Sequence, residues 1–490
     1  MKKLMMTAVL MLACLSLSAA DKVDRPRLVV GIVVDQMRWD YLYRYYEQMA
    51  EGGLKRLLKE GYNFDNMHFN YVPTVTAAGH ASVFTGTTPA IHGIAGNWFR
   101  LNGEPMYCVA DTTVKGVGST SKAAIMSPRN MMTTSMCDQL RLATDFRSKV
   151  IGVALKDRAA ILPAGHAANG AFWFDNAIGG FVTSTYYMNE LPGWVKSFNR
   201  DNKVGEKEDI WILPKGLALT TKMAIAALDG ERLGRQNDQT DFLTISYSST
   251  DVMGHKYGTR GPKTDEMYLA LDKELRTLFE VLDSRIGRDK YLLFLTADHA
   301  AGHNAKYLND HRLPGGQVGY SGKMRKELPK AMADRFGGVK VVKDVMGGQI
   351  YLDYEAIEKA RLSVSEVNKA VCRFVMNYDG VQYVVPFDEL MTTPIPFPIR
   401  DRILLGTCPR RSGDIIVIER PNYYDYSYDE GSSHSQWAPY DTHVPFILMG
   451  WHITSGHTNR PVSIPDIAAT VCALLKIQMP TGCIGTPLIE

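Results

Sequence analysis

Residues 28–35, LVVGIVVD, form a short apolar run that ends in the carboxylate of Asp35. Such runs are typical of strands buried on both faces of a parallel sheet, and ligands bind at the carboxyl ends of these strands. Two further runs are each followed by acidic and imidazole side chains: 242–247 by Asp251 and His255, and 291–296 by Asp298 and His299. We therefore expect these side chains to gather at one edge of a sheet.

Helical patterns separate the apolar runs and predict an α/β fold. They cover residues 41–58, 78–85 and 264–282, and a further strand is predicted at 150–154. This alternation predicts a mostly parallel central sheet with helices on both faces, in one large catalytic domain over residues 21–490. Residues 162–235 and 305–430 fit the pattern less well. We expect them to be inserted loops or subdomains over the carboxyl edge of the sheet, where loops carry function.

The N-terminus and the net charge limit where the protein is located and what it binds. Residues 1–20 have the basic, apolar and small-residue regions of a secretory signal peptide, so we expect an exported, periplasmic protein. Cys14 raises lipidation as an alternative, although the residues before it fit a lipidation site poorly. The net charge of +3 falls to +1 when Lys2 and Lys3 leave with the signal, which gives no support for nucleic acid or an anionic membrane as partner. We expect a monomer without stable membrane insertion.

Six cysteines follow the signal. An exported chain permits disulfides, and a Cys472–Cys483 bridge would close a short loop. Buried free thiols are the competing interpretation.

The acidic and imidazole side chains suit divalent metals. Asp251 and His255 are four residues apart and could bind one ion, and His443, in a loop of its own, could supply a third ligand. Asp298 and His299, together with Asp35, could make a second site. Two such metals clamp the attacking and leaving oxygens of a phosphoryl transfer. Any one of these residues, taken alone, could instead be a satisfied polar group or a helix cap.

A threonine-rich turn, PTVTAAGH at 73–80, supplies the candidate nucleophile. Thr76 precedes a predicted helix, whose N-terminus favours an anion, and metal coordination would activate its hydroxyl. Thr74 is a competitor, and either residue could be no more than an N-cap.

Three further side chains could bind phosphate oxygens. Lys156 and Arg158 follow the strand at 150–154 and would share a face in an extended conformation, and Asn97 lies in a glycine-rich turn. The alternative for the basic pair is a solvated surface.

These motifs together resemble the alkaline phosphatase superfamily, and specifically its PafA-type bacterial alkaline phosphatases. The resemblance runs from about residue 27 to the C-terminus, with Ala159 at a position where glycine is expected. It implies one zinc on Asp251, His255 and His443 and another on Asp35, Asp298 and His299, with Thr76 reaching the metals. It also implies a covalent phosphothreonine on Thr76, and non-bridging oxygens bound by Asn97, Lys156 and Arg158.

The resemblance implies a two-zinc phosphomonoesterase that acts on small phosphorylated metabolites. Sulfatases of the superfamily carry a Cys or Ser where Thr76 stands, so a sulfatase is disfavoured. A phosphodiesterase or nucleotide pyrophosphatase is the first alternative, although Lys156 and Arg158 favour monoesters. A non-catalytic binding protein on a decayed enzyme scaffold is the second, and manganese or iron could replace one zinc.

Overall fold

The computed structural model describes residues 23–206, 208–235, 239–425 and 429–489. The predicted signal peptide, with Cys14, lies outside these residues. Across the described ranges, no helix has the length and apolar character that a bilayer crossing requires.

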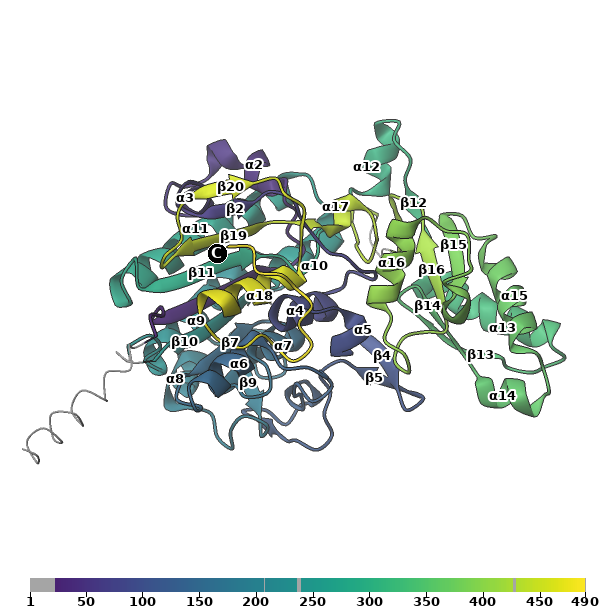
Figure 1. Ribbon diagram of the computed structural model, residues 1–490, viewed down its shortest axis with the longest axis horizontal. Coiled ribbons are helices and arrows are strands. Elements are labelled where there is room, and N and C mark those ends of the chain that lie inside the picture. The colour runs from purple at the N-terminus through teal and green to yellow at the C-terminus, as the bar shows by residue number, and fades with distance from the viewer. Residues whose placement is uncertain (1–22, 207, 236–238, 426–428, 490) are drawn as a thin grey trace, which may run out of the picture.

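A ten-stranded sheet forms the centre of the larger lobe (Figure 1). Its strands, in spatial order, are β20 (Gly456–Thr458), β2 (Tyr62–Phe64), β19 (Phe446–Gly450), β11 (Tyr291–Thr296), β1 (Leu28–Val34), β10 (Asp241–Tyr247), β7 (Val150–Ala154), β8 (Gly170–Asp175), β9 (Gly180–Ser184) and β6 (Gly116–Val117). The five strands from β11 to β8 are parallel, while β19 and β9 run antiparallel to their neighbours. The predicted α/β fold with a mostly parallel sheet is confirmed.

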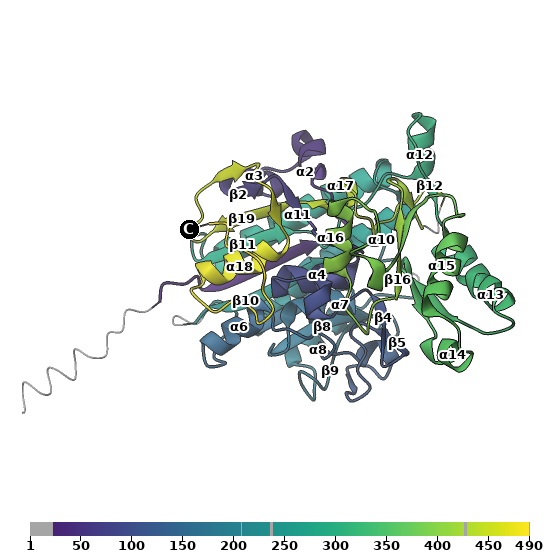
Figure 2. The same cartoon turned by 45° about the vertical axis from the view of Figure 1, so that its right-hand side comes forward.

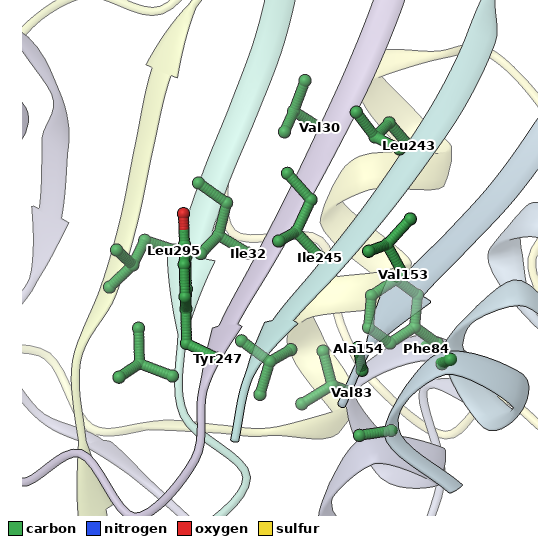
Figure 3. Packing of buried hydrophobic residues seen from close by; sticks show 14 of the residues in the cluster. Val30, Ile32, Val83, Phe84, Val153, Ala154, Leu243, Ile245, Tyr247 and Leu295 are labelled. Atoms are coloured by element: carbon green, nitrogen blue, oxygen red, sulfur yellow. The ribbon is translucent and has the colours of Figure 1, made fainter. Parts of the chain in front are cut away.

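The central strands are buried along their whole length, which explains their continuous apolar sequences. Every residue of β1, β7, β10 and β11 is buried. Their apolar side chains form one core with those of the flanking helices, from which Figure 3 shows Val83 and Phe84 of one helix. Phe84 lies against Phe242 and Phe294, with ring centroids 6.2 and 5.8 Å away. Full burial of one such side chain stabilises the fold by about 1.5–3 kcal/mol, so this core fixes the strand ends that carry the site.

Two groups of helices cover the two faces of this sheet. One group packs together around α4 and consists of α4 (Thr76–Thr85), α5 (Pro89–His92), α6 (Met136–Ala143), α7 (Asp157–Ala164) and α18 (Pro465–Leu474). The other packs around α11 and consists of α3 (Leu54–Glu60), α8 (Gly193–Asp201), α9 (Lys215–Gly230), α10 (Ser249–Tyr257) and α11 (Pro262–Arg285). Both α7 and α9 contact β7 and β10, so these strands are covered from both sides.

A second, smaller lobe lies within residues 305–430, the range of the second predicted insertion. Its antiparallel sheet has the order β13 (Val342–Met346), β14 (Gln349–Leu352), β16 (Ile415–Glu419) and β15 (Val381–Pro386). Helices α13 (Arg325–Arg335), α14 (Tyr354–Lys359) and α15 (Val364–Val375) complete it, around a separate apolar core. A third cluster, which includes Val72 and Ile403 of α16 (Phe397–Gly406), joins it to the larger lobe.

Short elements complete the two lobes and the region between them. They are the hairpin β4 (Trp98–Leu101) and β5 (Glu104–Tyr107), the small sheet β18 (His443–Val444), β3 (Met67–His68) and β21 (Val462–Ser463), and the pair β12 (Gly316–Gln317) and β17 (Tyr423–Tyr424). Helices α2 (Tyr41–Arg44), α12 (Ala305–Asp310) and α17 (Pro439–Thr442) complete the set. The β4–β5 hairpin lies beside the smaller lobe in both Figure 1 and Figure 2.

Three expectations need correction. Residues 162–235 are not an insertion over the sheet, because β8 and β9 extend the sheet itself and α9 packs on it. The helix expected over 41–58 is interrupted between α2 and α3, where the chain runs through Gly52 and Gly53. The six cysteines of the described residues are free thiols, so Cys472 and Cys483 form no disulfide.

Candidate active site

The predicted side chains meet at the carboxyl edge of the parallel strands. Asp35 follows β1, Lys156 follows β7, α10 begins just after β10, and Asp298 and His299 follow β11. Asp35, Asp298 and His299 have no solvent exposure. Parallel strands align their carboxyl ends, so residues far apart in sequence are brought together there.

Three buried ligand atoms lie around the His299 ring beside β1 and β11. Of the residues described, Asp35, Asp251 and His299 form one group whose ligand atoms all lie within 4.8 Å of one another. Asp35 Oδ1, Asp298 Oδ2 and His299 Nε2 are buried and make no hydrogen bond. His299 Nε2 lies 3.6 Å from Asp35 Oδ1 and 3.5 Å from Asp298 Oδ2. Ligand atoms about 2.0–2.2 Å from a tetrahedral zinc stand about 3.3–3.6 Å apart. Unpartnered polar atoms are costly in a protein interior, and a bound cation would satisfy all three.

His80 does not relieve this deficit. Its Nδ1 lies 3.2 Å from Asp298 Oδ2, but the Thr76 carbonyl accepts from the same nitrogen at 2.9 Å. The other ring nitrogen, Nε2, bonds to the Ser246 hydroxyl at 2.8 Å. His80 therefore links the start of α4 to Asp298 and is not available as a ligand.

The second candidate metal group consists of Asp251, His255 and His434, whose ligand atoms lie within 4.8 Å of one another. Asp251 Oδ1 is 3.2 Å from His255 Nε2 and 3.8 Å from His434 Nε2. The spacing of Asp251 and His255 on α10 brings them to one face, as predicted from the sequence. His434 comes from the chain that returns from the smaller lobe.

The three histidines of the two groups share one orientation. The Nδ1 atoms of His255, His299 and His434 lie 3.0, 3.0 and 2.7 Å from the backbone carbonyl oxygens of Ser432, Ala300 and Thr74. A carbonyl only accepts, so Nδ1 carries the proton and Nε2 presents a lone pair to the centre. Metal-bound histidines are held in the same way.

His443 does not join the group that the sequence analysis gave it. It lies in β18, paired with β3, and its ring stacks between Trp39 and His68 with centroid separations of 4.6 and 4.5 Å. Its Nε2 donates to the Asp65 carbonyl at 2.8 Å. The pairing of β18 with β3 turns this side chain away from the site, and His434 takes its place.

The electrostatics of the site fit bound cations. Burial would raise the pKa of Asp251, but its interactions with His255 and Lys156 hold it well below its usual value. Burial would lower the pKa of His255, but the same contact with Asp251 raises it. Burial lowers the pKa of His434 and that of His299, so both rings are neutral, as metal ligation requires. Burial and the nearby charge of Asp298 raise the pKa of Asp35 well above its usual value. The negative charge of Asp35 is therefore undercompensated by the protein alone.

Lys156 stands between the two groups. Its Nζ donates to Asp35 Oδ2 and to Asp251 Oδ2, both at 2.6 Å. Gln36 also links them, since its side-chain amide donates to Asp251 Oδ1 at 2.7 Å and its backbone N–H to Asp298 Oδ1 at 3.1 Å. Gly254 permits this approach, because a Cβ there would stand 1.9 Å from Gln36 Oε1.

Thr76 is the first residue of α4 and is buried. The first turn of α4 approaches β11 so closely that a Cβ on Gly79 would stand 2.0 Å from the Asp298 carbonyl oxygen. Asn97 Oδ1 accepts from the Ala77 N–H at 2.9 Å, which leaves the side-chain N–H groups of Asn97 to face another acceptor. Thr74, the competing nucleophile, is occupied, because its hydroxyl donates to Asp441 Oδ1 at 2.7 Å.

Arg158 lies on the first turn of α7, not on the extended segment that was expected. It accompanies Lys156 because α7 starts directly after that residue. One guanidinium nitrogen donates to the Tyr107 hydroxyl at 2.9 Å, while Nε is buried without a partner. Tyr107 in turn donates to Asp157 at 2.6 Å, so the β4–β5 hairpin holds Arg158 in place.

The sequence analysis missed His434, Gln36 and Tyr107. His434 follows no strand and carries no helical period, so no local pattern marks it. Gln36 directly follows Asp35, but its residue type does not indicate a role. The positive φ of 65° at Gln36, which aims its amide at Asp251, is visible only in the structure.

A family model described as type I phosphodiesterase / nucleotide pyrophosphatase matches residues 29–444. The chain belongs to this family.

Relatives within this family include named alkaline phosphatases. The chain is 41% identical to alkaline phosphatase PafA of Elizabethkingia meningoseptica, over 100% of this chain and 98% of that protein. It is 40% identical to alkaline phosphatase PhoV of Synechococcus elongatus, over 96% and 93%. A Myroides odoratus protein named as a calcium-transporting ATPase is 40% identical, over 100% and 99%.

The fold agrees with these relatives. A crystal structure of PafA matches with a TM-score of 0.90 and 42% identity, over 95% of this chain and 99% of that one. A PafA variant in which one threonine, one asparagine, one lysine and one arginine are substituted matches equally well, with a TM-score of 0.90. The predicted resemblance to PafA-type alkaline phosphatases is confirmed, and the protein is an enzyme of this group.

Proposed function

We propose that the protein is an exported, two-zinc phosphomonoesterase that uses Thr76 as its nucleophile. The observation that carries the proposal is the set of unpartnered ligand atoms of Asp35, Asp298 and His299, placed beside the start of α4. The group of Asp251, His255 and His434 would hold the second ion. Zinc bound there would supply Lewis-acid stabilisation of the nucleophile and leaving oxygens.

Thr76 would attack phosphorus from the Asp298 side. The attack forms an Oγ–P bond and breaks the bond between phosphorus and the leaving oxygen, and a proton completes the alcohol. Water then cleaves the phosphothreonine, which restores the Thr76 hydroxyl and releases inorganic phosphate. The N-terminus of α4 favours the negative charge that gathers at this residue.

Lys156, Arg158 and Asn97 would bind the other phosphoryl oxygens. Lys156 places a charge between the two groups, and the unpartnered Nε of Arg158 offers a second donor. The substituted residues of the PafA variant support this assignment. In both chains the threonine and the asparagine are 21 positions apart, and the lysine and the arginine are two positions apart. Fixed donors act on charge that develops in the transition state.

Two fixed cationic side chains favour monoesters over diesters. A phosphate monoester carries one more charged oxygen than a diester, and Lys156 and Arg158 are placed to compensate it. The family description includes phosphodiesterases, so a diester substrate is the alternative to test. The name of the Myroides relative makes ATP a useful third substrate.

The test compares hydrolysis of p-nitrophenyl phosphate, bis-p-nitrophenyl phosphate and ATP by the purified protein, before chelation, after it and with zinc restored. Zinc-dependent activity that favours the monoester is expected, and Thr76→Ala should reduce it to near background while the metal content stays at two equivalents. A diester preference would assign the alternative activity. Full activity of Thr76→Ala would exclude the covalent mechanism.

Export and oligomeric state are proposed from the sequence. N-terminal sequencing of the protein from the periplasmic fraction should give Asp21 as the first residue, and light scattering should give a monomer. A chain retained in the cytoplasm with Met1 intact would contradict export.

A further inference from the structure

Two cavities flank the β4–β5 hairpin. One, of about 590 Å³, lies between the lobes and is lined by Asn97, Trp98 and His434 from the larger lobe and by Arg325 and Gln349 from the smaller one. The other, of about 520 Å³, is lined by residues that include Tyr107, Lys156, Arg158 and Trp211. Cavities of this size hold small organic molecules, whereas the phosphoryl group alone needs far less space.

The direction of the in-line displacement indicates which of the two cavities receives the leaving group. Thr76 begins the helix whose first turn approaches Asp298, and an in-line displacement sends the leaving oxygen to the opposite side. That side is the group of Asp251, His255 and His434, and His434 itself lines the larger cavity together with Ser433 and Ser435. The smaller cavity opens at Lys156 and Arg158, the residues proposed to bind phosphoryl oxygens.

Trp98 is the largest apolar surface at the mouth of the larger cavity. It follows Asn97 directly, begins β4 and is 56% exposed. Its ring leans on Tyr107, with ring centroids 5.2 Å apart, so the hairpin supports it from behind. An exposed, supported indole next to a phosphate-binding residue is suited to stack on a planar group.

The charges of the larger cavity favour an uncharged occupant. Asp344 and Asp425 outnumber Arg325, whose guanidinium already pairs with Asp344 at 3.1 Å. A leaving group that carries further phosphates would meet carboxylates there. A neutral ring system would meet Trp98, Val345 and Met346.

We propose that the cavity between the lobes receives the leaving group and that Trp98 stacks on it, which selects esters of planar, uncharged alcohols such as nucleosides and phenols. This inference rests on the proposed phosphomonoesterase function and names its substrate class. Trp98 acts on specificity and does not take part in the chemical step.

The test uses Trp98→Ala and, as a matched control, Trp211→Ala, which removes an indole from the other cavity. Adenosine 5′-monophosphate and phenyl phosphate are compared with glycerol 2-phosphate, whose leaving group has no ring. Stacking on a half-exposed indole gives an expected loss of about five- to tenfold in kcat/KM for the ring substrates relative to glycerol 2-phosphate, carried by KM. Trp98→Phe should restore most of it, and adenosine should inhibit Trp98→Ala more weakly than the wild type.

The outcomes are distinct. An unchanged selectivity ratio in Trp98→Ala, or a loss confined to Trp211→Ala, would overturn the inference and leave the phosphatase function intact. A wild-type protein that hydrolyses none of the three esters would overturn the proposed function itself.

Discussion

Replacement of His434 and of His443 by alanine distinguishes the metal group seen in the structure from the one that sequence spacing suggested. His434 Nε2 faces Asp251 Oδ1 at 3.8 Å and its Nδ1 is fixed by the Thr74 carbonyl. His443 faces neither group of ligands. The two histidines are nine residues apart on the same returning chain and serve as controls for one another.

The two substitutions should affect different quantities: His434→Ala the affinity for zinc, and His443→Ala the free energy of unfolding. His434→Ala reduces one three-residue ligand group to two residues. Loss of a residue that only supports a ligand weakens metal binding about 10–100-fold, so loss of the ligand itself should exceed about 100-fold. His443→Ala removes one hydrogen bond, worth about 1 kcal/mol, and two ring contacts of about 0.5–1.5 kcal/mol each. It should lower the free energy of unfolding by about 2–4 kcal/mol and release no metal.

The assay is a zinc titration of each metal-free variant against a chromogenic chelator, with bound metal counted by mass spectrometry and stability followed by thermal unfolding. His434→Ala should hold one tight equivalent and His443→Ala two. If His434→Ala keeps two equivalents at wild-type affinity, or if His443→Ala loses one, the assignment of this group is wrong.

Three further substitutions test other parts of the site. Arg158→Ala should reduce p-nitrophenyl phosphate turnover more than diester turnover, because a diester offers one charged oxygen fewer; equal losses would contradict the proposed clamp. Asp441→Asn should lower kcat about tenfold with both metals retained, because Asp441 accepts hydrogen bonds from the Thr74 hydroxyl and the Gln436 N–H at 2.7 Å each. The loss should not add to the loss caused by Thr74→Val. Burial raises the pKa of Glu419 from 4.5 to about 7, so the folded state binds the extra proton and the free energy of unfolding should fall by up to about 3 kcal/mol as pH rises from 4.5 to 7. Glu419→Gln should abolish that decline in urea titrations across this range, and an unchanged decline would place its cause elsewhere.

The strands that carry the site were predictable because they are buried on both faces. The runs at 28–34, 150–154 and 291–296 coincide with β1, β7 and β11. Their ends carry Asp35, Lys156 and Asp298, and the parallel pairing of the strands brings these ends together. In this part of the chain, a residue that follows an apolar run in the sequence therefore lies at the site in the structure.

The same rule failed at His443. This residue precedes an apolar run, and that run is indeed a strand of the sheet, β19. However, His443 itself lies in the short strand β18. This strand pairs with β3, which turns the histidine toward Trp39. His434 could not be found by any local rule, since it reaches the site only because the smaller lobe returns the chain there. Residues 162–235 were also misjudged, because their strands β8 and β9 contain glycine, tryptophan and phenylalanine and do not read as the aliphatic runs of the central strands.

The elements that carry the ligand side chains suggest which lobe positions each half of the site. Asp35, Asp298 and His299 stand on strand ends within the main core, and the His299 ring also stacks on His434 with ring centroids 3.6 Å apart. The other group includes His434, whose loop is tied to the smaller lobe by the hydrogen bond from the Gln436 side chain to Glu419 Oε2 at 2.5 Å. The smaller lobe therefore supplies walls of the leaving-group cavity and also fixes one ligand of the metal group on the leaving-group side. Thr76, Asp35, Asp298 and His299 all come from the larger lobe, which allows leaving-group preference to change without replacing any of them.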